Sequence, residues 1–246
     1  MNEQEPKVDN VRKNFHQTLD DIRQEMVVMA ALVTEGIPRA TEAMLTGDLA
    51  EAQRIIDDDD PLDARAVELE EVCYQVLALQ QPMAGDLRGI VTAVRMIAEI
   101  ERSGDLVVNI AKGSRRIFGT ELSARLRGLI GQMGEEATLL FRLSIDAYVD
   151  GDAAMGAALD DLDDRLDAIH RDYVQEIFLA HNDGQLGVQP AVQLALIGRY
   201  YERIGDHAVN IGERVRYMVT GWLPEHTGAA RVAAREAKPP SAPGHE

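Results

Sequence analysis

The sequence contains little cysteine, few aromatic residues and few positive charges. Cys73 is the only cysteine in 246 residues, which excludes a disulfide framework and a thiolate metal site. Aromatic residues make up 4% of the chain, and 25 Lys and Arg face 42 Asp and Glu, for a formal net charge of -17. Nucleic acid and anionic lipid bind basic patches, so neither is expected as a partner. Cations and basic protein surfaces are the partners that this charge favours.

Long apolar runs are lacking too. The longest uninterrupted run spans residues 26–33, whereas a membrane-spanning helix needs about 20 apolar residues. The first ten residues are polar and have no apolar segment of the signal-peptide type. We therefore expect a cytoplasmic protein.

Helical periodicity is abundant, and the breakers in it define the layout. Residues 1–119 and 120–221 each read as a three-helix unit, and residues 222–246 read as a disordered tail rich in Ala, Pro, Gly and charge. The Gly-Asp breaks that follow the first helix of each unit lie 104 positions apart. The pattern predicts an all-α fold of two tandem three-helix bundles, with six long helices at about 11–45, 48–80, 86–118, 121–149, 152–180 and 190–219. Pro61 marks a point at which the second helix can kink.

One phrase occurs in the third helix of both units. ERSGDLVVNI begins at Glu101, ERIGDHAVNI begins at Glu202, and seven of the ten positions are identical. Residues four apart share a helix face, so Glu101 pairs with Asp105 and Glu202 with Asp206. Like charges at this spacing cost an isolated helix roughly 0.2–0.5 kcal/mol, and an interior glycine costs roughly 1 kcal/mol relative to Ala. Because these costs in helix stability occur in both units, we expect that the residues have a role that compensates for them.

The middle helices carry acidic pairs at the same spacing, Asp59 with Asp63 and Asp163 with Asp167. If the middle and third helices of a unit pack antiparallel, four carboxylates face one another in an oxygen-only environment suited to Mg, Mn or Fe. The glycine inside each repeated phrase allows a close approach to the backbone. Acidic pairs are also common on solvated helix faces, which is the simpler interpretation of any one pair. Duplication with flanking Arg, Gly and Asn favours metal coordination for the set.

Other polar residues are weaker candidates. Arg102 and Arg203 are expected at the surface, and His207 is expected at the surface or in an interface. His170 lies three residues after Asp167, but no matching histidine follows the other pairs, so it is not counted as a ligand. The nucleotide-binding, hydrolase and zinc-protease motifs G-x-x-x-x-G-K, G-x-S-x-G and H-E-x-x-H are absent from the sequence.

Residues 81–112 and 199–215 resemble the PhoU family, the accessory regulators of bacterial phosphate-specific transport. The resemblance implies two three-helix bundles related by pseudo-twofold symmetry. It also implies a multinuclear metal cluster, with iron first and Mn, Mg or Zn as alternatives, held by the motif (E/D)-x-x-x-D. Residue by residue, that motif falls on Asp59, Asp63, Glu101, Asp105, Asp163, Asp167, Glu202 and Asp206. Ser103 departs from the family pattern, which usually has Ile, but it is not a ligand position.

The function that the resemblance implies is negative regulation of the phosphate-starvation response, without catalysis. Such a protein is an adaptor, expected as a homodimer, that links the ATPase subunit of the Pst transporter to a PhoR-like sensor histidine kinase. It docks on a membrane complex without entering the lipid. The alternatives are a carboxylate-bridged multinuclear metalloenzyme, an oxidase or a phosphatase, and a metal-free helical scaffold.

Overall fold

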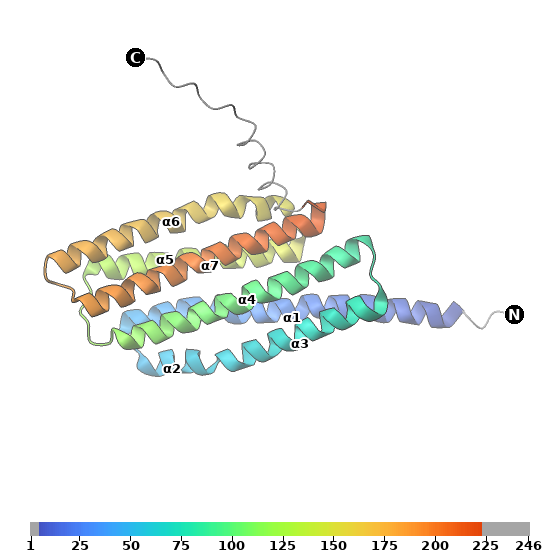
Figure 1. The fold of residues 1–246 in the computed structure, drawn as a ribbon, viewed down its shortest axis with the longest axis horizontal. Coiled ribbons are helices and arrows are strands. Elements are labelled where there is room, and N and C mark those ends of the chain that lie inside the picture. The colour runs from blue at the N-terminus through green and yellow to red at the C-terminus, as the bar shows by residue number, and fades with distance from the viewer. Residues whose placement is uncertain (1–4, 223–246) are drawn as a thin grey trace, which may run out of the picture.

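The computed structural model describes residues 5–222, with side chains from Phe15 onward, and all its regular structure in that range is helical. Seven helices follow one another (Figure 1): α1 Glu5–Thr46, α2 Leu49–Asp57, α3 Asp59–Gln80, α4 Ala84–Arg116, α5 Ala124–Asp150, α6 Ala153–Asn182 and α7 Val188–Thr220. The predicted all-α plan of six helical segments is confirmed. One segment differs, because the helix expected over 48–80 is broken into α2 and α3 at Asp58.

Proline accounts for the break. Pro61 has no N–H to donate to the carbonyl of Asp57, so the chain restarts as α3 with Pro61 in its first turn, where proline is tolerated. The corresponding residue in the second unit, 104 positions on, is Arg165, and α6 runs through it without interruption.

The Gly-Asp turns work in the same way in both units. Gly47 and Gly151 adopt positive φ angles of 72° and 64°, the left-handed conformation that ends a helix at low cost for glycine. Asp48 then accepts hydrogen bonds from two backbone N–H groups of α2, and Asp152 does so for α6. These local interactions explain why both boundaries were predictable.

The two units lie side by side along their length (Figure 1). Helix α4 runs antiparallel to α7, since Arg88 Nε donates to the Met218 carbonyl at 3.2 Å near one end and Arg116 contacts Gln193 near the other. Buried side chains from both units form one continuous hydrophobic core. The division at residues 119 and 120 therefore stays a prediction. The tail predicted over 222–246 lies outside the described residues except for Trp222.

Between residues 5 and 222, no helix combines the length and the apolar character needed to cross a bilayer. Cys73 is fully buried, as expected for a residue that packs in the core.

Candidate metal centre

The first acidic quartet lies between α3 and α4. Helices α2 and α3 run antiparallel to α4, as expected, because Leu62 packs on Gly104 while Gln53 accepts from Arg115 farther along α4. A Cβ atom added to Gly104 would lie 2.3 Å from Leu62 Cδ2. The glycine therefore permits the close helix contact that brings Asp59 and Asp63 toward Glu101 and Asp105.

The carboxylates of this quartet repel one another. The pKa of Asp59 is raised by burial and then by Asp63 and Asp105, although Lys112 acts in the opposite direction. Burial and Asp105 raise the pKa of Asp63. The pKa of Glu101 is raised by burial, Asp105 and Asp63. Carboxylates from two helices thus share one electrostatic environment, which favours a cation between them.

The second quartet lies between α6 and α7 and is more tightly enclosed. A Cβ atom added to Gly205 would lie 2.3 Å from Asp163 Oδ1 and 2.8 Å from Leu166 Cδ2. The Asp163 carboxylate thus occupies the space that a side chain at position 205 would need. Burial, followed by the charges of Asp167 and Asp206, raises the pKa of Asp163 to about 7.

Two buried oxygen atoms of this second quartet, Asp163 Oδ1 and Glu202 Oε2, have no hydrogen-bond partner among the described residues. Buried polar atoms are normally paired, so unpaired carboxylate oxygens beside other carboxylates fit a cation-binding role. No three His, Cys, Asp or Glu side chains within residues 15–222 gather closely enough to enclose one ion. The donor types fit a hard cation, and the side chains present carboxylate pairs instead of a closed coordination shell.

The predicted site residues differ in exposure. Half-buried members are Asp59, Glu101, Asp163, Asp167 and Glu202, and exposed members are Asp63, Asp105 and Asp206. Arg102 and Arg203 are exposed, as predicted.

One basic residue at the second quartet was missed by the sequence reasoning. Arg199 forms ion pairs with Glu202 and, at 3.7 Å, with Asp206. The equivalent position of α4, 101 residues earlier, is Ala98. The available signal was the three-residue spacing from Arg199 to Glu202, on one helix face, together with its absence from the first unit.

His207 and Asn210 belong to a different cluster. His207 is buried between α7 and α4, so of its two expected locations the surface is wrong and an interface within the chain is observed. Its Nδ1 lies 2.6 Å from Glu99 Oε2, and Asn210 Nδ2 donates to the same oxygen at 3.1 Å. Burial opposes ionisation of Glu99, but these hydrogen bonds together with nearby positive charge, including that of Arg102, leave the pKa of Glu99 below its usual value. Pairing with an acid on another helix could not be read from the spacing within α7.

Comparison with known proteins identifies both repeats. The PhoU domain matches residues 26–113 and 130–215. The phosphate-specific transport system accessory protein PhoU homolog 1 of Mycobacterium tuberculosis is 37% identical over 215 residues, covering 87% of this chain and 96% of that protein.

Solved structures agree with the sequence relatives. The crystal structure of PhoU from Pseudomonas aeruginosa matches with a TM-score of 0.80 and 26% identity, covering 85% of this chain and all of that one. The phosphate transport system regulatory protein PhoU from Streptococcus pneumoniae matches with a TM-score of 0.78 and 26% identity, covering 85% of this chain and 98% of that one. With both repeats matched and its fold shared, the chain belongs to the PhoU family.

Proposed function

We propose that this chain is an accessory protein of a phosphate-specific transport system and a negative regulator of the phosphate-starvation response. The observation that carries the proposal is the match of the PhoU domain to both repeats. In addition, the match to a relative named as such an accessory protein covers 96% of that protein's length. In this role the protein is an adaptor between the transporter's ATPase subunit and a PhoR-like sensor histidine kinase. An acidic, helical surface suits binding to basic protein surfaces.

The adaptor role requires no turnover. The Cys73 thiol is buried, and burial raises its pKa to about 11, so it is not a nucleophile at neutral pH. The sequence also lacks the paired Glu-x-x-His ligands of di-iron carboxylate enzymes. Both observations support a binding protein over the metalloenzyme alternative.

We further propose that the two quartets hold metal. Asp59, Asp63, Glu101 and Asp105 would hold one cluster, and Asp163, Asp167, Glu202 and Asp206 the other, with iron first and Mn, Mg or Zn as alternatives. Bound cations supply positive charge that offsets carboxylate repulsion. Each quartet has two carboxylates on each helix of a pair, α3 with α4 or α6 with α7. A bound cation would therefore link the two helices and make the pair more rigid. The unpaired oxygens of Asp163 and Glu202 support this assignment.

A phosphate-starvation reporter tests the regulatory role. In phosphate-rich medium, deletion of the gene should induce the reporter, and restoration of the gene should repress it again. Unchanged repression in the deletion strain would contradict the proposal. Strains restored with all four carboxylates of one quartet changed to the amides then show whether regulation depends on metal.

The alternatives have their own tests. Oxygen consumption or phosphatase activity of the metal-loaded protein, lost with Glu202→Ala and Asp206→Ala, would establish a metalloenzyme. Purified protein without transition metal, in which neutralising all eight carboxylates changes neither stability nor signalling, would establish a metal-free scaffold. Light scattering in solution tests the expected homodimer.

A further inference from the structure

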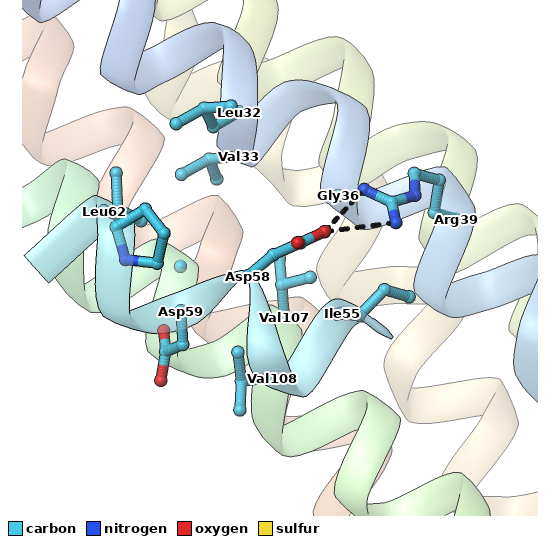
Figure 2. Close-up of a pocket in the computed structure, with 12 residues that line it drawn as sticks. Leu32, Val33, Gly36, Arg39, Ile55, Asp58, Asp59, Leu62, Val107 and Val108 are labelled. Carbon is cyan, nitrogen blue, oxygen red and sulfur yellow. Dashed lines mark hydrogen bonds and ion pairs between the residues drawn. The ribbon is translucent and has the colours of Figure 1, made fainter. Parts of the chain in front are cut away.

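A pocket of about 230 Å³ opens in the first unit at the break between α2 and α3 (Figure 2). It lies between α1, α4 and the two helices on either side of Asp58. Most of its lining is aliphatic, from Leu32, Val33, Ile55, Leu62, Val107 and Val108. Asp59 and Gly104 line it as well, so the pocket adjoins the first quartet.

The second unit carries different residues at the corresponding positions. Gly36 of the pocket wall corresponds to Leu140, which is 1% exposed. At the outer edge, the position of Leu32 is taken by the buried Glu136, and Arg165 pairs with Glu136 at 3.0 Å. The lining of the pocket is therefore only partly repeated in the second unit.

Its size limits what can bind. An apolar cavity of about 150 Å³ holds one benzene molecule, whereas pockets for drug-sized ligands measure about 300–1,000 Å³. A pocket of about 230 Å³ accommodates one aliphatic or aromatic side chain. Protein partners commonly anchor themselves by inserting such a side chain into a preformed apolar pocket.

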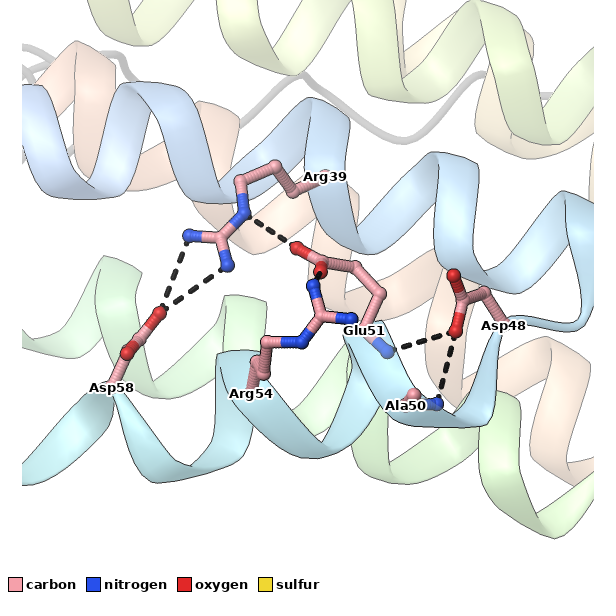
Figure 3. Close-up of polar contacts among 6 residues, drawn as sticks. All are labelled: Arg39, Asp48, Ala50, Glu51, Arg54 and Asp58. Carbon is pink, nitrogen blue, oxygen red and sulfur yellow. Dashed lines mark hydrogen bonds and ion pairs between the residues drawn. The ribbon is translucent and has the colours of Figure 1, made fainter.

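The charge at the rim selects what surrounds the inserted side chain. Asp58 and Asp59 line the pocket within a run of four aspartates, residues 57–60. Arg39, the basic residue in the lining, is already paired with Glu51 at 2.7 Å and with Asp58 at 3.3 Å (Figure 3). An anionic ligand would meet these carboxylates, whereas lysine or arginine beside the anchor would complement them.

We propose that this pocket is a docking site for a partner-protein segment that inserts one aliphatic or aromatic side chain flanked by lysine or arginine. The proposal rests on the adaptor function above and names the contact chemistry by which a partner engages the first unit. Apolar burial supplies the affinity, and the aspartate rim supplies the selection.

Nine-residue peptides test the site directly. One carries a central leucine between two pairs of lysines, the second a central alanine, and the third a central leucine between two pairs of glutamates. Methyl-labelled full-length protein is titrated with each peptide and followed by NMR. The lysine–leucine peptide should shift the methyl signals of Leu32, Val107 and Val108. The other two peptides should bind at least about tenfold more weakly.

A filled variant provides the matched comparison. Gly36→Leu with Val107→Ala copies Leu140 and Ala208 of the second unit, and the alanine makes room because a Cβ on Gly36 would lie 3.1 Å from Val107 Cγ1. It should lose binding at least about tenfold. Gly128→Leu places the same group on an exposed helix face with nothing within 4 Å of the added Cβ, and it should bind as the parent does. Circular dichroism checks that both variants fold.

The outcomes separate this proposal from the regulatory one. Absent shifts, shifts elsewhere, equal binding of the glutamate peptide, or full binding by the filled variant would each overturn the docking site. If the site binds as expected while the deletion strain keeps full repression, the adaptor role fails and the pocket stands. If deletion induces the reporter while the filled variant binds peptide and represses normally, the pocket proposal alone fails.

Discussion

The two units place four carboxylates at equivalent positions of equivalent helix pairs, α3 with α4 and α6 with α7, but the surroundings of the two quartets differ. In the first unit, Gly104 of α4 faces the flexible end of Leu62, and Ala98 occupies the position that corresponds to Arg199. In the second unit, Gly205 of α7 faces the Asp163 carboxylate. Arg199 forms ion pairs with Glu202 and Asp206. The carboxylate positions are shared, whereas the packing and the nearby basic charge differ between the units.

The distance between the packed helices also differs between the two units. The α6–α7 contact at Gly156 and Gly212 is so close that a Cβ on either residue would lie 2.6 Å from the other's carbonyl oxygen. The corresponding residues of the first unit, Ala52 and Ala111, are both alanines and are fully buried. The second unit is thus the tighter one, and the first keeps an open pocket beside its quartet. Four predictions test this contrast.

The largest effect is expected from Gly212→Ala, which gives the second unit the residue of the first. The new methyl group would meet backbone of α6, which cannot rotate away, so we expect a loss of about 3 kcal/mol in the free energy of unfolding. Urea unfolding of chelator-treated protein measures it. Gly128→Ala, on an exposed helix face, should instead gain up to about 1 kcal/mol. Similar effects of the two changes would show that the helices are not in backbone contact.

Gly205→Ala and Gly104→Ala compare the glycines of the repeated phrase. At Gly205 the added methyl group displaces the Asp163 carboxylate and Leu166, whereas at Gly104 only the end of Leu62 must rotate. We expect losses of about 2 and about 1 kcal/mol respectively, with weaker Mn²⁺ binding only for Gly205→Ala. Unfolding curves and calorimetric titration provide the measurements. The reverse order would contradict the closer packing of the second unit.

Asp163→Asn should stabilise the metal-free protein in a pH-dependent way. The folded pKa of Asp163, about 7, lies above its unfolded value of about 3.9, so the folded state binds the extra proton between these values. The stability that this proton contributes is therefore fully present below the unfolded pKa, falls as pH rises and is lost above about pH 7. Solvent screening limits the gain from Asp163→Asn to about 1 kcal/mol at pH 8, with almost none at pH 4.5. An equal gain at both values would place Asp163 outside the repelling cluster.

The smallest effect is expected from Arg199→Ala. Its side chain is half exposed, so losing its ion pairs should cost only about 0.5 kcal/mol in chelator. If Glu202 and Asp206 bind metal as proposed, Arg199 competes with the cation for them, and the rise in melting temperature on adding Mn²⁺ should be larger in the variant. Ala98→Arg, which gives the first unit the same arginine, should make the rise in melting temperature on adding Mn²⁺ smaller. Thermal unfolding with EDTA and with Mn²⁺ measures both, and an unchanged Mn²⁺ effect would show that Arg199 does not compete.

Much of the fold was predictable because its signals are local. Gly47 and Asp48 end one helix and cap the next within a few residues, and the same pair recurs at 151 and 152. Pro61 signalled a kink, but whether the helix would bend or break depends on packing around Asp58. The four acidic pairs could be placed on helix faces because spacing by four residues is a property of the helix itself.

The chain's sequence alone determined the helical class, the duplicated plan, the Gly-Asp boundaries and the acidic pairs, since capping, periodicity and spacing act within one or two helical turns. The tertiary structure decided which carboxylates are half-buried, that His207 meets Glu99 across 108 positions, and that Leu140 is buried whereas its counterpart Gly36 lines an open pocket. Such features depend on how helices distant in sequence pack side by side. Two copies of one motif could therefore acquire different surroundings while keeping the same local pattern.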